Sequence, residues 1–163
     1  MTDIQPLSLH TETVREAWID YNGHMNVAYY VLTFDNATDA FFDHIGLDAG
    51  YRARTNCTTF AVEGHITYDR EVKLGDPLRF TTQLLGFDQK RIHFFHCMYH
   101  ADEGYLASTT ELMSLHVDAV ARKTTPLHAD IMENLAALWE TQKQIPRPPQ
   151  VGRSLSLTGK RAS

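Results

Sequence analysis

Hydrophobic positions recur every three to four residues in one long stretch near the start of the chain. The apolar side chains of this stretch are Val27, Tyr30, Val31, Phe34, Ala37, Phe41 and Ile45. This spacing places them on one face of an α-helix of about five turns. Gly46 is a suitable residue to end it. The pattern therefore predicts a long helix that begins near Asn26 and ends near Gly46.

Most of the remaining chain has the composition or the alternation of β-strands. Residues 9–19 are rich in Thr, Val and aromatic character and stop at a turn-forming Asp-Tyr-Asn-Gly. Further runs alternate at 60–68, 78–85, 92–99 and 106–117, and Gly-, Pro- and Asp-containing turns separate them. The spacing is typical of antiparallel hairpins. A shorter helix is predicted at 127–140, after Pro126.

The order of these elements predicts an α+β fold. We expect an antiparallel five-stranded sheet, curved around the long central helix, with an additional C-terminal helix. Residues 1–140 would form this domain. Residues 141–163 are Pro-rich and basic, and their composition predicts a flexible or extended tail.

Composition narrows the class of function. With 163 residues, 43% hydrophobic and 21% charged, the chain has the size and balance of one globular domain. A net charge of -5 argues against nucleic-acid binding, and no apolar run approaches the roughly 20 residues of a membrane span. Two cysteines without a CxxC motif favour a reducing compartment, so we expect a cytoplasmic enzyme of small molecules.

Polar residues gather just before the long helix, in the segment Asp-Tyr-Asn-Gly-His-Met-Asn at 20–26. Together with Tyr30 and the acidic Asp35, this segment resembles the Asp-x-x-Gly-His-x-Asn motif region of the 4-hydroxybenzoyl-CoA thioesterase-like family. Tyr68, Val72 and Gly75-Asp76 are similar to a second signature of that family. The resemblance covers about residues 9–120. It implies the hotdog fold and a homodimer or homotetramer whose active sites lie between subunits.

A narrower resemblance lies in the later strands. Residues 88–96, 100–107 and 110–113 look like the betainyl-CoA thioesterases of carnitine catabolism, and the tail at 148–153 fits that subgroup. The resemblance implies hydrolysis of betainyl-CoA to glycine betaine and CoA. No dissociable cofactor is expected, because coenzyme A is part of the substrate.

The helix start offers a physical reason for the polar segment. Backbone N–H groups there have no intrahelical partner, so those of Gly23, His24 and Met25 would form an oxyanion hole for the thioester carbonyl. Gly23 would leave room for the substrate to approach. In the resembling family the residue matching Asp20 is the catalytic carboxylate, as nucleophile or as general base. Without that resemblance, a structural turn with Asn26 as helix cap explains the same residues.

Other candidate residues concern substrate binding. Asn22 and Asn26 would fix a water or cap the helix. Glu63 lies in an apolar strand and either faces solvent or reaches Asp20 of a partner subunit. Trp18 and Tyr30 are aromatic candidates for the trimethylammonium of a betainyl group. At a predicted hairpin, two further candidates would bind the phosphates of CoA, Lys90 and Arg91.

Several alternatives remain at this stage. A thioesterase for aromatic or fatty acyl-CoA would use the same motif, and a hotdog hydratase or dehydratase would use His24 with Glu63. An acyl-CoA sensor would need a DNA-binding segment, for which no pattern is found. A metal site at His93, His96 and His100 is not expected, because His93 would point to the opposite face of its strand from the other two.

Overall fold

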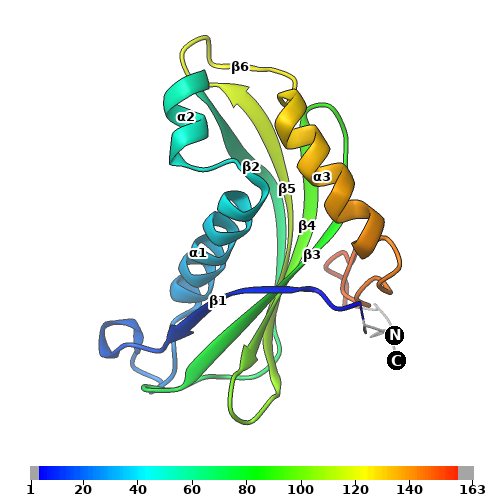
Figure 1. The fold of residues 1–163 in the computed structure, drawn as a ribbon. Coiled ribbons are helices and arrows are strands. Elements are labelled where there is room, and N and C mark those ends of the chain that lie inside the picture. Colours follow the sequence, from blue (N-terminus) through cyan, green and yellow to red (C-terminus); the bar gives the residue numbers. More distant parts are fainter. Residues whose placement is uncertain (1–3, 158–163) are drawn as a thin grey trace.

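A computed structural model describes residues 4–157 as a curled antiparallel sheet with the long helix α1 against its concave side (Figure 1). The strands are β1 (Leu7–Thr13), β2 (Cys57–Tyr68), β3 (Pro77–Phe87), β4 (Arg91–His100), β5 (Leu106–Asp118) and the two-residue β6 (Lys123–Thr124). The helices are η1 (Glu16–Trp18), α1 (Val27–Ile45), α2 (Ala49–Thr55) and α3 (Ala129–Gln142). The strand order is β1-β3-β4-β5-β2, with β6 paired to β5. The predicted α+β arrangement of five long strands and a central helix is confirmed.

Helix α1 begins and ends at the predicted residues. The side chain of Asn26 accepts a hydrogen bond from the Ala28 N–H at 2.9 Å, which caps the first turn. Gly46 ends the helix in the left-handed conformation at φ 92°, which a glycine adopts without strain. Five of the predicted apolar residues lie in the core, and Phe34 and Phe41 are almost fully buried. Val27 and Val31 were predicted on the same face but are 58% and 54% exposed, so the buried face is narrower than predicted.

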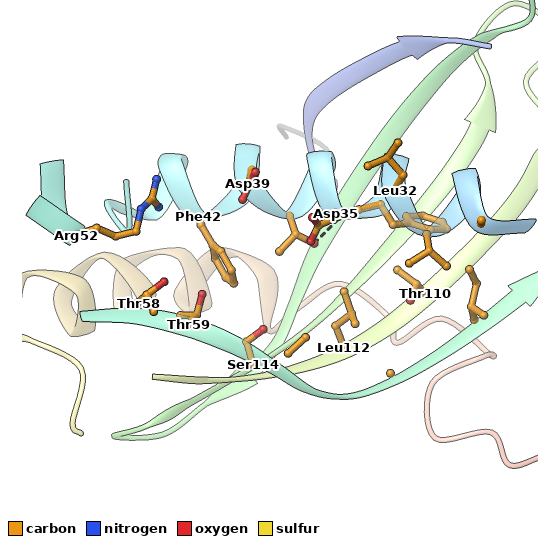
Figure 2. Close-up of a pocket in the computed structure, with 17 residues that line it drawn as sticks. Leu32, Asp35, Asp39, Phe42, Arg52, Thr58, Thr59, Thr110, Leu112 and Ser114 are labelled. Atoms are coloured by element: carbon orange, nitrogen blue, oxygen red, sulfur yellow. Dashed lines mark hydrogen bonds between the residues drawn. The ribbon is translucent and has the colours of Figure 1, made fainter. Parts of the chain in front are cut away.

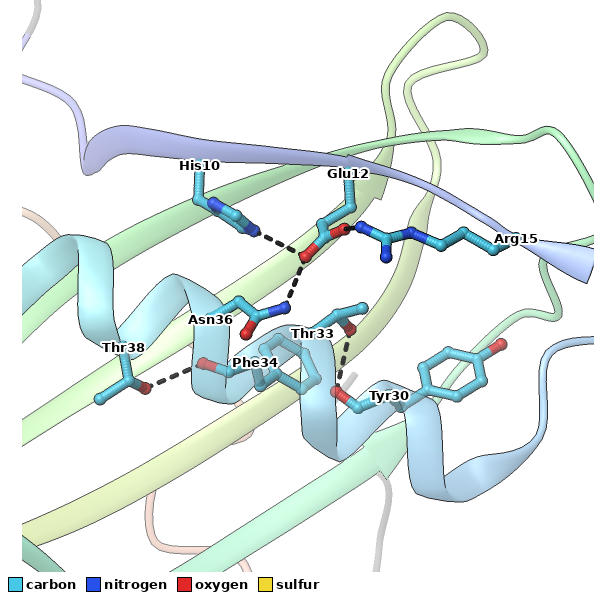
Figure 3. Close-up of polar contacts among 8 residues, drawn as sticks. All are labelled: His10, Glu12, Arg15, Tyr30, Thr33, Phe34, Asn36 and Thr38. Atoms are coloured by element: carbon cyan, nitrogen blue, oxygen red, sulfur yellow. Dashed lines mark hydrogen bonds and ion pairs between the residues drawn. The ribbon is translucent and has the colours of Figure 1, made fainter. Parts of the chain in front are cut away.

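Polar contacts tie α1 to the edge strand β1 (Figure 3). The carboxylate of Glu12 accepts a hydrogen bond from the Asn36 amide of α1 at 2.7 Å. The same carboxylate lies 3.1 Å from His10 Nε2 and 3.5 Å from Arg15 Nη2. The Glu12 side chain is only 6% exposed, so these partners compensate the burial of its charge.

The first predicted strand was too long, and one helix was missed. Strand β1 ends at Thr13, opposite Pro77, where β3 begins, so no partner strand exists for the residues that follow. Those residues form η1 instead. Helix α2 lies between the predicted long helix and the next predicted strand, in a segment for which no element was predicted. Its N-cap is Asp48, and Tyr51 is its one buried residue, so it carries no apolar periodicity to recognise.

Helix α3 and the tail cover the remaining part of the sheet. Strand β1 pairs with β3 only up to Thr82, and beyond it the Leu84 N–H donates to the Gln142 side chain at 2.5 Å. The tail then crosses the sheet without regular structure, and Arg147 donates to the Leu85 carbonyl at 2.9 Å. The expected domain boundary at 140 falls inside α3. The last tail residues, 158–163, lie outside the described residues.

The described helices contain no segment that is both long and apolar enough to span a membrane. Cys57 and Cys97 are free thiols.

Candidate active site

The polar segment before α1 forms a closed loop. Ile19 and Met25 face each other in an isolated antiparallel bridge, and the Asp20 N–H donates to the His24 carbonyl at 3.0 Å. The Gly23 N–H donates back to the Asp20 carbonyl at 3.0 Å. Gly23 has φ 78°, so the turn itself favours glycine, and no atom lies within 4 Å of the position where a Cβ would stand. The loop is therefore fixed by its own backbone before any substrate arrives.

Two asparagines hold the carboxylate of Asp20. One oxygen accepts the backbone N–H of Asn22 at 2.8 Å, and the other lies 3.4 Å from the side-chain nitrogen of Asn26. Asn26 caps α1 with its oxygen at the same time. Its amide thus connects the helix start to the candidate catalytic group, and the cap expected for this residue is present.

The backbone donors near Asp20 are not equally available. The Gly23 N–H is used by the turn, and the Met25 N–H donates to the Val72 carbonyl at 2.9 Å. In the described part of the chain, the N–H groups of His24 and Val27 have no such partner. Val27 is the first residue of α1, where the helix dipole adds partial positive charge. These two groups are the available oxyanion donors.

A cavity of about 270 Å³ lies beside this loop, between the start of α1 and the end of β2. We call it the Asp20 cavity. Its lining residues are Asp20, Asn22, His24, Met25, Val27, Tyr30, Tyr68, Asp69, Arg70 and Glu71. The rings of Tyr30 and Tyr68 meet edge to face at 5.3 Å. Burial raises the pKa of both phenols, so both stay protonated at neutral pH.

The side chain of His24 has a partner of its own. Its Nε2 lies 3.1 Å from a carboxylate oxygen of Glu71, which follows β2 in the chain. The hydratase alternative pairs His24 with Glu63, but Glu63 is exposed on β2 and does not line the Asp20 cavity. Within one chain the two are therefore not brought together.

Three other predicted residues also lie away from the cavity. Trp18 is 5% exposed, and its ring stacks on Tyr29 at 5.7 Å, so it belongs to the core. Lys90 and Arg91 occupy the β3–β4 turn, where Arg91 pairs with Asp88 at 2.6 Å. Arg91 is opposite Leu115, whereas the Asp20 cavity adjoins the other end of β5. A CoA contact from these two residues to a site in the same chain is not supported.

A second, larger hollow of about 780 Å³ lies between α1 and strands β2 and β5 (Figure 2). We call it the α1–β2 groove. Its lining residues are Ala28, Val31, Leu32, Phe34, Asp35, Thr38, Asp39, Phe42, Arg52, Thr58, Thr59, Ala61, Gly64, Ile66, Thr110, Leu112 and Ser114. Partial burial, with the nearby Asp35 carboxylate, raises the pKa of Asp39. The groove is apolar near the Asp20 cavity and acidic farther along the helix.

The strand histidines point as their spacing predicts. His96 is buried between the hydroxyls of Thr38 and Thr82, each 2.9 Å from a ring nitrogen. His93 instead meets Glu111 on the outer face at 2.7 Å. Among residues 4–157, no group of three or more metal-binding side chains lies close enough together to hold an ion.

Sequence reasoning overlooked four of the residues that line the Asp20 cavity. Three of them, Asp69, Arg70 and Glu71, follow the end of β2, about 50 residues after Asp20, and no local motif marks them. Val27 was read only as part of the apolar face of α1. Its position directly after the cap was the available signal, since the first N–H groups of a helix lack intrahelical partners.

Several known proteins are similar to this chain in sequence and in fold. The model of the thioesterase-like superfamily matches residues 14–135. The betainyl-CoA thioesterase of Pseudomonas aeruginosa is 37% identical over 94% of this chain and 96% of its own length. The L-carnitine dehydrogenase/betainyl-CoA thioesterase of Rhizobium meliloti is 40% identical over 91% of this chain, which covers 30% of that longer protein.

A solved structure agrees with the fold. A Staphylococcus aureus protein in complex with CoA superposes with a TM-score of 0.86 at 30% identity, covering 96% of this chain and 99% of that one. The expected hotdog architecture and family are thereby confirmed. The chain belongs to the thioesterase-like superfamily.

Proposed function

We propose that this protein hydrolyses a short acyl-CoA thioester, betainyl-CoA, to glycine betaine and CoA. The named activity of its relatives in Pseudomonas aeruginosa and Rhizobium meliloti supports the substrate. The observation that carries the reaction is the carboxylate of Asp20, held by Asn22 and Asn26 at the start of α1. His24 and Val27, whose backbone N–H groups have no partner among the described residues, line the same cavity.

Asp20 supplies the reacting carboxylate. As general base it takes a proton from water while the water oxygen attacks the thioester carbon. As nucleophile its own oxygen attacks, and water then cleaves the resulting anhydride. In both routes the carbon–sulfur bond breaks, CoA leaves as a thiolate, and that sulfur takes up a proton. In a single turnover in H₂¹⁸O, label in the Asp20 carboxylate identifies the nucleophilic route.

The N–H groups of His24 and Val27 stabilise the oxygen that becomes negative during attack. Donors fixed in advance at such a position are typically worth about 3–4 kcal/mol of barrier each. The helix N-terminus adds to the effect. The role of Gly23 is then to hold the turn, and its N–H does not act as a donor to the substrate.

The test is release of free thiol from betainyl-, acetyl-, hydroxybenzoyl- and long-chain acyl-CoA. We expect rapid cleavage of betainyl-CoA by the wild type and a loss of about a thousandfold or more in Asp20→Asn, which keeps the size of the side chain but not its charge. Asp43→Asn, on the exposed side of α1, is the matched control and should retain activity. An active Asp20→Asn would refute the assignment, and no cleavage of any thioester by wild type would refute the function.

A second candidate substrate is an aromatic or longer acyl-CoA. The observation in its favour is the α1–β2 groove, whose 780 Å³ exceed what the small betainyl group would fill. Preference for a longer chain in the same panel would identify this substrate. In that case the catalytic residues and the hydrolysis reaction proposed above would stay the same, and only the acyl group would differ.

We also propose a homodimer or homotetramer in the cytoplasm. Strand β2 is an edge of the sheet, and Phe60, Val62, Val31 and Leu32 expose apolar surface on β2 and α1. Such surface is usually covered by a partner. The free thiols of both cysteines support a reducing compartment. The CoA complex of the Staphylococcus aureus relative supports CoA as the carrier group.

A further inference from the structure

The phosphates of coenzyme A cannot lie beside the reacting carbonyl. Roughly 13 bonds along the pantetheine arm separate the thioester sulfur from the first phosphorus, so the two atoms are about 16 Å apart when the arm is extended. A cation that binds this phosphate therefore lies outside the Asp20 cavity, at the far end of the arm.

A hollow of about 410 Å³ lies between β2 and the tail, on the face of the sheet away from α1. We call it the tail hollow. Strand β2 and the residue after it contribute 65–69 to its lining, and the tail contributes Pro149, Gln150, Arg153 and Leu155. Tyr68 and Asp69 also line the Asp20 cavity, so the two hollows meet where β2 ends.

The tail places a cation at a suitable distance. The Gly152 N–H donates to the Glu111 carboxylate at 2.7 Å, and Glu111 is opposite His65 of β2. Arg153 follows directly. Because His65 is three residues before Tyr68, this anchor lies about 10 Å along the strand from the Asp20 cavity. An arm of about 16 Å covers that distance and leaves about 6 Å to pass the end of β2.

The side chain of Arg153 is available for an anion. It is exposed, and none of the residues 4–157 forms an ion pair with it. Arg147, the other arginine of the described tail, instead donates to the Leu85 carbonyl at 2.9 Å. The tail hollow thus contains a guanidinium that the fold itself does not use.

Arg70 is a less suitable partner for the phosphate. Its guanidinium lies 3.8 Å from the centroid of the Tyr105 ring and 3.9 Å from a carboxylate oxygen of Glu103. It also lines the Asp20 cavity, where the acyl end of the substrate lies. An extended arm would carry the phosphate past it.

The acidic residue of the tail hollow lies away from Arg153. Asp69 is four residues after His65, or about 13 Å along the chain. Its carboxylate accepts a hydrogen bond from the Thr67 hydroxyl at 2.7 Å. It therefore borders the uncharged part of the arm, whose amide N–H groups a carboxylate can accept, and it does not repel the phosphate at close range.

We propose that Arg153 binds the first phosphate of CoA while the pantetheine arm passes the end of β2 into the Asp20 cavity. This assignment rests on the proposed thioesterase function and adds a residue that recognises the carrier. A guanidinium suits the role, because its planar fork donates two parallel hydrogen bonds to phosphate oxygens. Arg153 takes no part in bond breaking.

Two substrates that differ by one phosphate isolate this contact. Betainyl-4′-phosphopantetheine ends in the phosphate, and betainyl-pantetheine ends in a hydroxyl at the same place. The measurement is the ratio of kcat/KM for the two thioesters in wild type, Arg153→Gln and Arg153→Lys. The matched control is Arg122→Gln, which removes a guanidinium from the β5–β6 turn outside the tail hollow. If the wild type prefers another acyl group, the same pair carries that group.

We expect wild type to prefer the phosphorylated thioester, and the ratio to fall about five- to tenfold in Arg153→Gln. Arg153→Lys keeps a charge and should lose less, and Arg122→Gln should keep the ratio. Added salt should lower the ratio of wild type much more than that of Arg153→Gln, because salt screens an exposed pair of charges.

Three results would overturn the proposal, and they are distinguishable. The same ratio in wild type and Arg153→Gln removes the phosphate contact but leaves the thioesterase intact. An equal fall in Arg153→Gln and Arg122→Gln does so too, because the loss then follows from net charge alone. Failure of wild type to hydrolyse any CoA thioester removes the proposed function together with this contact.

Discussion

At the scale of single residues, Asn26 shows how one side chain serves both folding and chemistry. Its oxygen caps α1 through the Ala28 N–H, and its nitrogen reaches toward Asp20. A helix cap is fixed by backbone geometry, so the amide that caps is already oriented when substrate binds. This couples the position of the carboxylate to the helix that supplies the oxyanion donor.

We predict that Asn26→Ala lowers both stability and turnover. Loss of the cap should cost about 1 kcal/mol of unfolding free energy, and the misplaced carboxylate should lower kcat by roughly ten- to a hundredfold. Asp48→Ala is the matched control, because Asp48 caps α2 through Tyr51 in the same way but lies outside the Asp20 cavity. It should lose similar stability and keep kcat. Equal kcat losses in both variants would contradict the coupling.

His96 makes stability depend on pH. Burial, with the nearby His10, lowers its pKa from 6.5 to about 3, so the folded protein holds it neutral between Thr38 and Thr82. The unfolded chain binds a proton there below pH 6.5 and the folded chain does not. Stability is therefore lost as pH falls from 6.5 toward 3, by up to about 1.4 kcal/mol per pH unit.

Urea unfolding at pH 7 and pH 5 checks this. The difference between the two pH values should be about 2 kcal/mol smaller in His96→Gln than in wild type. The amide of Gln still offers a donor and an acceptor to the two threonines. An unchanged pH dependence in His96→Gln would show that another group causes it.

At the scale of elements, the tail acts as a cover for the outer face of the sheet. Gln83 donates to the Ile145 carbonyl at 3.2 Å, and the Gly152 N–H donates to Glu111 at 2.7 Å. Leu85 and Phe95 are 2% and 1% exposed, yet neither belongs to the two core clusters around α1. The tail therefore buries side chains that the helices do not reach.

We predict that a chain ending after Gln144 is less stable but keeps the Asp20 cavity. Exposure of Leu85 and Phe95 should cost a few kcal/mol of unfolding free energy, seen as a lower midpoint in urea. Arg147→Ala, which removes only the bond to the Leu85 carbonyl, should cost about 1 kcal/mol. Full stability of the shortened chain would mean that the tail contributes nothing to the fold.

At the scale of the whole molecule, helix α1 and the edge strand β2 both expose apolar side chains. Val27, Val31 and Leu32 of α1 are 58%, 54% and 42% exposed, and Phe60 and Val62 of the edge strand β2 are 44% and 53% exposed. An unpaired edge strand beside an apolar helix face is a surface on which a second copy would pack. The Asp20 cavity lies at one end of this surface.

We predict that light scattering during gel filtration gives the mass of a dimer or tetramer for wild type. Val62→Asp, which places a charge in the middle of the β2 edge, should shift the mass toward the monomer of 18.6 kDa. Lys123→Asp, on β6 away from this surface, is the control and should not change the mass. A monomeric wild type at micromolar concentration would contradict the prediction.

The sequence by itself determined most of the elements, although not η1, α2 or β6. Periodicity and caps are local, so α1, four strands and the turn before α1 could be predicted. The resemblance of residues 20–26 to the Asp-x-x-Gly-His-x-Asn motif then identified Asp20. Only the tertiary structure decided which residues line the Asp20 cavity and which backbone N–H groups are available there. The Met25 N–H is taken by Val72, and Tyr68 and Asp69 come to lie beside Asp20, because a curled antiparallel sheet returns distant residues to one end of the helix. Such neighbours depend on register and curvature, which no short segment specifies.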